Sequence, residues 1–194
     1  MPPAPLTAAA KGRRFYNGGV SIHQIQLRYD PLADRMLLSV RTRDAALYTA
    51  WLTRRMVARL HAPLAQAVGR MVLARSAPGA LPVPEAQAML VQSARERVLP
   101  TADFSQPFVD EAASRPLGTE PLLPARMTID PAAAGQLQIV LAEERGRHLR
   151  LGLGEDLAAA LLRLLEQCLR QADWGLPLPA PAPDAPAAGP RTLN

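Results

Sequence analysis

Apolar and polar residues alternate along two separate stretches of the chain, and a helical pattern follows each stretch. The first stretch predicts three strands, at residues 22–29, 36–43 and 47–52. In the first of these, Ile25 and Leu27 share one face, because successive side chains of a strand point to opposite sides. Short turns separate the three segments, so the pattern predicts an antiparallel meander.

A helix is expected directly after the third strand. Thr53 can cap it, because its hydroxyl can accept a hydrogen bond from a backbone amide of the first turn. Apolar residues then recur at helical spacing and predict a buried stripe of Leu52, Met56, Leu60, Leu64, Val68 and Met71. Pro63 lacks an amide hydrogen, so we expect a kink or the start of a second helix near it.

The same layout returns in the second half of the chain. Strands are expected near residues 126–129, 137–141 and 148–153, and a helix at residues 155–172. The apolar stripe of this helix comprises Leu157, Leu161, Leu164, Leu165, Cys168 and Leu169. The repeat predicts an α+β fold of two pseudo-symmetric units, each of antiparallel strands followed by a long helix. Such units could also form a homodimer through their helices.

The repeat divides the chain into five segments. They are a flexible N-terminal arm (1–19), a first sheet-plus-helix unit (20–75), a connecting helix near 84–99 with an irregular loop (76–124), a second unit (125–175) and a disordered Pro/Ala-rich tail (176–194). The prolines of the tail remove amide donors and favour extended polyproline conformation, so the tail should not pack. In the irregular loop, five apolar residues are expected to hold the segment to the body: Phe104, Phe108, Leu117, Leu122 and Leu123.

Basic residues are concentrated in the first half. The chain has 22 Lys and Arg, of which only Lys11 is lysine, and a formal net charge of +5. This arginine skew is typical of a GC-rich bacterial genome. Residues 11–75 hold 12 basic and 3 acidic residues, a net charge of +9, and the remainder carries −4. The asymmetry indicates either a basic surface for an anionic partner, most often nucleic acid, or two halves that neutralise each other across their interface.

Six arginines are candidates for contact with nucleic acid or another anion. The polar face of the first sheet is predicted to hold Gln24, Gln26, Arg28, Ser39, Arg41 and Arg43, and the start of the helix adds Arg54, Arg55 and Arg59. Arginine can bind phosphate through two parallel hydrogen bonds, although the more usual interpretation of such a face is the solvent side of an antiparallel sheet. Lys11, Arg13 and Arg14 would form a loose basic arm. Trp51 is expected to be a core anchor rather than a stacking platform.

In layout alone, a duplicated unit of strands and a helix resembles the Whirly and Pur-type single-strand binders. Those folds have four strands in each unit, whereas three are expected here. No motif residue carries the resemblance, so it transfers no site residues.

The sequence offers little for catalysis, cofactors or membranes. It has no P-loop, G-x-G-x-x-G, G-x-S-x-G or C-x-x-C motif, its three histidines are scattered, and Cys168 is its single cysteine. Catalytic residues, a metal and a cofactor are therefore not expected.

No segment approaches the ~20 apolar residues of a membrane helix, and the order of charge at the N-terminus is not that of a secretory signal. We expect a cytoplasmic protein without a membrane partner.

These observations favour a non-enzymatic binding module that binds single-stranded nucleic acid through the basic sheet face of its N-terminal half. The alternative is a protein-interaction or assembly subunit that engages an acidic protein and has no nucleic-acid role. An enzyme of another type stays open as a third possibility, because active sites can assemble from residues far apart in sequence.

Overall fold

The structure is a computed structural model that describes residues 22–76, 85, 89, 111–132, 135–144 and 146–176. The predicted arm, with Lys11, Arg13 and Arg14, lies outside the described residues. So do the tail beyond residue 176 and, apart from positions 85 and 89, the predicted connecting helix.

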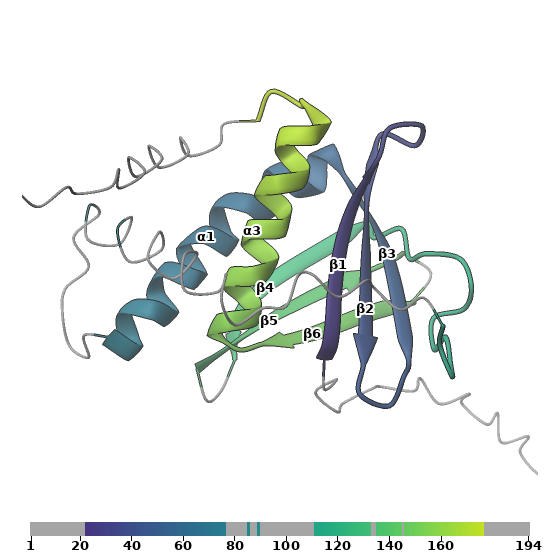
Figure 1. The fold of residues 1–194 in the computed structure, drawn as a ribbon, viewed down its shortest axis with the longest axis horizontal. Coiled ribbons are helices and arrows are strands. Elements are labelled where there is room, and N and C mark those ends of the chain that lie inside the picture. The colour runs from purple at the N-terminus through teal and green to yellow at the C-terminus, as the bar shows by residue number, and fades with distance from the viewer. Residues whose placement is uncertain are drawn as a thin grey trace, which may run out of the picture.

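Two antiparallel three-stranded sheets, each followed by a helix, form the fold (Figure 1). The first unit consists of β1 (Ile22–Asp30), β2 (Arg35–Thr42), β3 (Leu47–Thr53) and α1 (Arg54–Ser76). The second consists of β4 (Arg126–Ala132), β5 (Gln136–Ala142), β6 (His148–Leu153) and α3 (Glu155–Ala172). Both sheets have their strands in chain order. The predicted α+β fold of two similar units is confirmed.

The register of the first sheet separates its two faces. Leu27 pairs with Leu38, which pairs with Ala50, and all three are buried. One residue away, Gln26 pairs with Ser39 and Ser39 with Thr49 on the opposite face. Because directly paired residues share a face, the apolar residues predicted to point inward do so.

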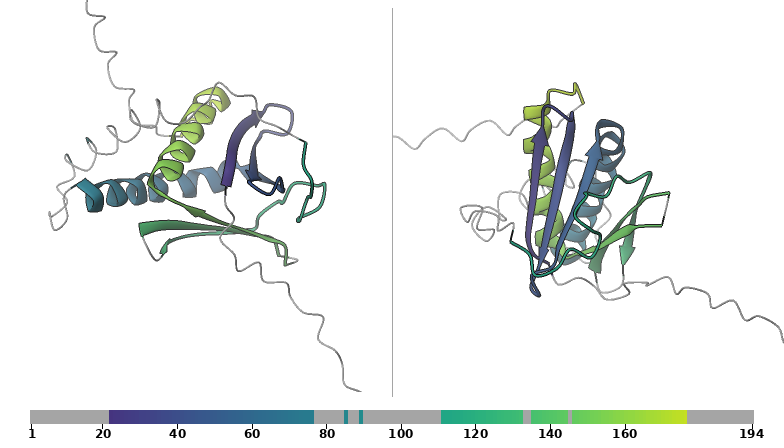
Figure 2. Two further views of the ribbon diagram at one scale, coloured as in Figure 1. Left: turned by 60° about the horizontal axis from the view of Figure 1, so that its bottom comes forward. Right: turned by 90° about the vertical axis from the view of Figure 1, so that its right-hand side faces the viewer.

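The two units share one hydrophobic core. α1 and α3 pack against each other, and each also packs against the first strand of the other unit, α3 on β1 and α1 on β4 (Figure 2). Buried residues of both sheets and both helices belong to a single cluster. The apolar stripes that a homodimer would need are therefore covered within the chain. No helix among the described residues has the length and apolarity needed to cross a membrane.

The helix boundaries follow the sequence closely. The amide of Met56 donates to Oγ1 of Thr53 at 3.4 Å, which is the predicted cap of α1. α3 has the predicted bounds. Four residues of its predicted stripe are buried (Leu161, Leu165, Cys168 and Leu169), Leu157 and Leu164 are half-buried, and Leu162 is buried in addition. No second helix starts near Pro63, because α1 continues through it to Ser76. Pro63 is exposed, so water can bind the carbonyl of Arg59 that lacks its usual amide donor.

The segment that leads into the second unit runs along the outer edge of β3. The amide of Leu47 donates to the carbonyl of Ser114 at 2.9 Å, and the amide of Trp51 donates to the carbonyl of Leu122 at 2.7 Å. These parallel bridges cover an edge that would otherwise expose unpaired backbone groups. The side chain of Leu122 is fully buried as expected, whereas the side chain of Leu123 is 44% exposed and does not pack against the body. Phe104 and Phe108 lie outside the described residues.

An ion pair fixes this segment to the second sheet. Arg147 donates to both carboxylate oxygens of Glu143, at 2.8 and 2.6 Å. Nη1 of Arg147 also donates to the backbone carbonyls of Leu117 and Glu120, at 2.8 and 3.3 Å. Oε1 of Glu143 in turn accepts a hydrogen bond from the backbone amide of Leu123 at 2.9 Å. The β5–β6 hairpin thus holds the loop that precedes β4.

Candidate anion-binding groove

The fold separates the six candidate arginines into different regions. Arg28 pairs in register with Leu37, near the β1–β2 turn. Arg41 lies four residues further along β2, which corresponds to about 13 Å. Arg54, Arg55 and Arg59 lie in the first turns of α1. The predicted sheet face and the predicted helix start are therefore not one continuous patch of arginines.

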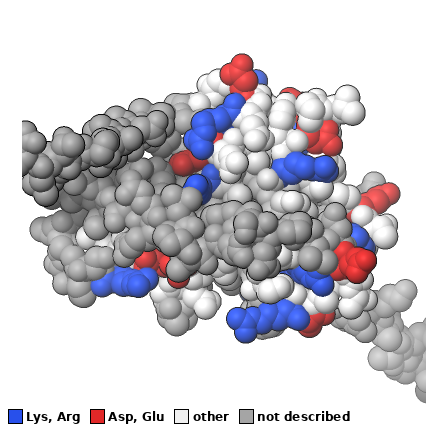
Figure 3. All heavy atoms as spheres, in the orientation of Figure 1, with Lys and Arg blue, Asp and Glu red and all other residues white. Residues whose placement is uncertain are grey.

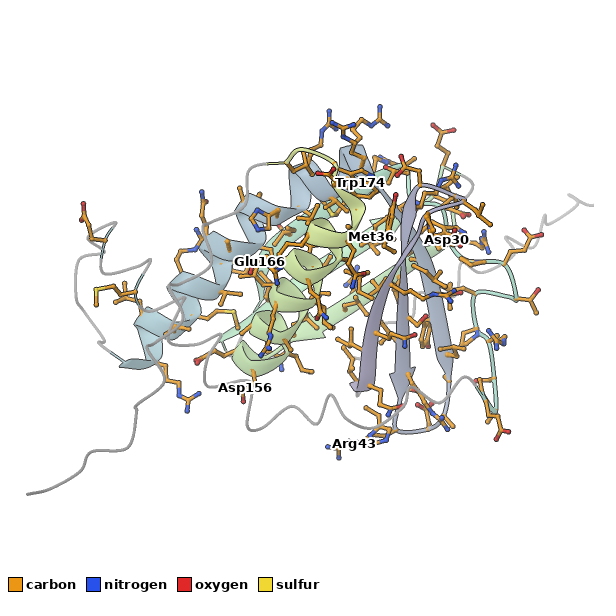
Figure 4. The ribbon with its side chains drawn as sticks, turned by 45° about the horizontal axis from the view of Figure 1, so that its top comes forward. Asp30, Met36, Arg43, Asp156, Glu166 and Trp174 are labelled. Carbon is orange, nitrogen blue, oxygen red and sulfur yellow. The ribbon has the colours of Figure 1, made fainter. Side chains whose placement is uncertain are left out.

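Arg43 is not on the sheet face. β2 ends at Thr42, whose hydroxyl bonds to Asp44 and to the amide of Ala46, the latter at 3.0 Å. These bonds turn the chain before Arg43 can continue the alternation of the strand. Figure 4 shows Arg43 at the opposite end of the first sheet from Asp30. The prediction that Arg43 shares the face of Arg28 and Arg41 is wrong for this reason.

The outer face of the first sheet carries few fully exposed side chains. Ser39 is buried, Gln24, Gln26 and Arg41 are half-buried, and Arg28 is exposed. Basic and acidic side chains are interspersed over the described surface that is visible in Figure 3. The distribution of charged residues over this surface therefore does not by itself locate a binding site.

A groove of about 400 Å³ lies between α1 and β4. Arg55 and Arg59, one helical turn apart, line it from α1, and Arg126 lines it from the start of β4. The remaining walls are mainly apolar, formed by Met56, Pro63, Ala125, Met127, Thr128 and Ile129. The groove depends on the packing of α1 on the first strand of the other unit.

Within the part of the chain that the structure describes, the three arginines of the groove have no carboxylate partner. None of the described residues that line the groove is acidic, and Arg55, Arg59 and Arg126 form no ion pair with any residue in the described ranges. All three are exposed. A cluster of like charges without a counter-ion repels itself, so it is stabilised when an anion enters.

Neighbouring charged residues are engaged elsewhere. His61 of α1 contacts the buried Glu166 of α3 at 3.3 Å, and Arg75 contacts Glu155 at 3.4 Å. Arg54 lies near Asp34, where its charge adds to hydrogen bonds from Trp174 and Tyr29 that lower the pKa of Asp34. Neutralisation between the halves thus occurs, but away from the groove.

Sequence reasoning missed Arg126 and misplaced Trp51. Arg126 is an ordinary first residue of a strand, and only the packing of β4 beside α1 brings it opposite Arg55. Trp51 pairs with Leu37 and so lies on the outer face of the first sheet, not in the core. The buried tryptophan is Trp174, which is 5% exposed (Figure 4).

The described residues contain no group of three or more His, Cys, Asp or Glu side chains placed to hold a metal ion. Cys168 is buried, and its burial raises the pKa of the thiol.

Comparison of the chain with protein-family models, curated proteins and solved structures gives no match.

Proposed function

We propose that the protein is a non-enzymatic binding module for single-stranded nucleic acid, whose phosphates bind in the groove between α1 and β4. The observation that carries this proposal is the convergence of Arg55, Arg59 and Arg126 on one groove without a carboxylate. Guanidinium groups bind phosphate oxygens in pairs of parallel hydrogen bonds.

The apolar walls suit the same ligand. Met56, Met127 and Ile129 offer uncharged surface beside the arginines. Methionine adapts to irregular shapes, so it can contact sugars and base faces without selecting a sequence. A flexible single strand can enter a groove between a helix and a strand, whereas a rigid duplex cannot follow it closely.

Fluorescence anisotropy with a labelled dT15 oligonucleotide tests the proposal. The variant Arg55→Gln/Arg59→Gln/Arg126→Gln should bind at least about tenfold more weakly. The dependence of log K on log[salt] should also become shallower by about 2, because three phosphate contacts are lost at about 0.7 each. A duplex of the same length should bind more weakly than dT15.

The matched control is Arg70→Gln/Arg150→Gln/Arg170→Gln. These three arginines are exposed and do not line the groove, and their loss changes the net charge equally. The control should bind dT15 nearly as well as the unmodified protein. Equal weakening in both triple variants would show that only net charge matters and would contradict the groove.

An acidic protein segment is the second candidate ligand, favoured by the position of β4. β4 is one of the two edge strands of its sheet and pairs only with β5 among the described strands. An extended acidic peptide could add to this edge, with its carboxylates on the same arginines. Competition between dT15 and polyglutamate distinguishes the two candidate ligands. If the site binds acidic peptides, polyglutamate should displace dT15 at an equal concentration of charge.

A further inference from the structure

We infer that Trp51 is the base-stacking residue of this single-strand site and selects ligands with unstacked bases over other polyanions. This inference rests on the proposed function and adds a chemical feature of the ligand, an unstacked base, that the protein recognises besides phosphate. Its starting observation is that an aromatic ring, expected in the core, lies on the outer face of the first sheet.

Trp51 lies in a row of residues across the outer face of the first sheet. It pairs with Leu37, and Leu37 pairs with Arg28 on β1. Two strand spacings separate Trp51 from Arg28, about 10 Å. Arg28 is exposed and forms no ion pair with a residue in the described ranges. A cation therefore stands within one or two nucleotides of the ring on this side.

Trp51 does not line the groove, but it is close in the chain to residues that do. α1 starts three residues after Trp51, so the Cα atoms of Trp51 and Arg55 are at most about 14 Å apart. The backbone amide of Trp51 also donates to Leu122, and the chain from Leu122 reaches Arg126 in four residues. Trp51 is thus in register with Arg28 on the outer face and only four residues from Arg55, the first arginine of the groove.

The second tryptophan makes a useful contrast. Trp174 is 5% exposed, packs edge to face against Tyr29 and donates its indole N–H to Asp34. Trp51 is half-buried and belongs neither to the core nor to the apolar residues packed against it. Of the two tryptophans in the chain, Trp51 is therefore the one placed to contact a ligand.

Stacking on an indole requires a base, whereas arginine requires only a phosphate. The site should therefore distinguish dT12 from an abasic 12-mer with the same number of phosphates. We expect the unmodified protein to bind dT12 about tenfold more tightly than the abasic strand. Duplex DNA, whose bases are already stacked, should resemble the abasic strand.

Variants of the full chain test the role of Trp51. Trp51→Leu should reduce the affinity for dT12 to that for the abasic strand and leave abasic binding unchanged. Trp51→Phe should restore part of the difference, because phenylalanine also stacks. Binding of dT12 should quench the fluorescence of the unmodified protein and leave that of Trp51→Phe, which retains Trp174, unchanged. Circular dichroism checks that each variant is folded. If Trp51→Leu unfolds, the comparison of Trp51→Phe with the unmodified protein still tests the stacking role.

The outcomes separate this inference from the proposed function. If the groove variant Arg55→Gln/Arg59→Gln/Arg126→Gln weakens both strands and Trp51→Leu changes neither, the groove stands and the stacking role of Trp51 is wrong. If neither strand binds at low salt, both proposals are wrong. If polyglutamate binds as tightly as dT12 and Trp51→Leu has no effect, the ligand is an acidic protein and the inference is overturned.

Discussion

The indole N–H of Trp174 donates a hydrogen bond of 2.6 Å to Oδ1 of Asp34 and ties the end of α3 to the β1–β2 turn. The hydroxyl of Tyr29 donates to the same oxygen at 2.8 Å, and the rings of Tyr29 and Trp174 meet edge to face with centroids 5.8 Å apart. Asp34 has a φ of 48°, in the left-handed region that aspartate tolerates better than most residues. One carboxylate therefore joins the first hairpin to the last helix.

Loss of this contact should destabilise the whole fold. We expect Trp174→Ala to lower the free energy of unfolding by about 3–5 kcal/mol, the usual cost of removing a large buried aromatic side chain. Trp174→Phe keeps much of the packing but loses the donor, so its effect should be smaller. Urea denaturation followed by circular dichroism measures both. Trp51→Phe, on the outer face, serves as the control and should cost less than about 1 kcal/mol; a larger loss there would contradict its placement outside the core.

The hydrogen bonds to the Asp34 carboxylate should make the protein less stable at both low and high pH. Hydrogen bonds from Trp174 and Tyr29 lower the pKa of Asp34 below its ordinary value of 3.8, so the unfolded chain takes up the proton first and stability is lost as the pH falls below 3.8. The hydrogen bond to Asp34 raises the pKa of Tyr29 above 10.0, so stability is also lost as the pH rises past 10.0.

The variants Asp34→Asn and Tyr29→Phe separate these two limbs. Asp34→Asn removes the acidic titration, so its urea midpoint should fall less steeply below pH 4 than that of the unmodified protein. Tyr29→Phe should flatten the decline above pH 10. If the urea midpoints of both variants change with pH as steeply as that of the unmodified protein, below pH 4 and above pH 10, Asp34 and Tyr29 do not contribute to this pH dependence.

The ion pair between Arg147 and Glu143 should control the mobility of the loop before β4. Glu143→Ala removes the acceptor of the Leu123 amide and one partner of Arg147. Hydrogen exchange measured by mass spectrometry should show residues 117–123 exchanging about tenfold faster, which corresponds to about 1.4 kcal/mol of lost local stability. Arg150→Ala, an exposed change on the same hairpin, should leave this exchange unchanged. Unchanged exchange in Glu143→Ala would mean that backbone pairing with β3 alone holds the loop.

Cys168 should report the opening of the interface between α3 and β1. Its Sγ donates to the carbonyl of Leu27 at 3.3 Å, and its burial raises the pKa of the thiol. We expect reaction with a disulfide reagent at pH 8 to be much slower in the folded protein than in urea. Trp174→Ala should accelerate the reaction, because it frees the end of α3, whereas Trp51→Phe should not. Fast labelling of the unmodified protein would contradict the packing of α3 on β1.

Local patterns in the sequence were sufficient where a residue's environment depends on its near neighbours. Alternation and helical spacing located six strands and two helices, and the hydroxyl of Thr53 marked the start of α1. β3 shows the limit of this reasoning. Its residues Leu47, Tyr48, Trp51 and Leu52 are apolar on both faces, so alternation could not assign an inner side. Only the pairing of Trp51 with Leu37 decided that this ring points outward.

The sequence by itself determined the elements of this protein, their order and their repetition, because strand and helix periodicity are properties of consecutive residues. The tertiary structure decided which helix covers which sheet and therefore where the groove lies. Arg55 and Arg126 are far apart in the chain and meet because α1 packs beside β4. Packing of this kind depends on how the surfaces of whole elements fit together, and no local pattern contains that information.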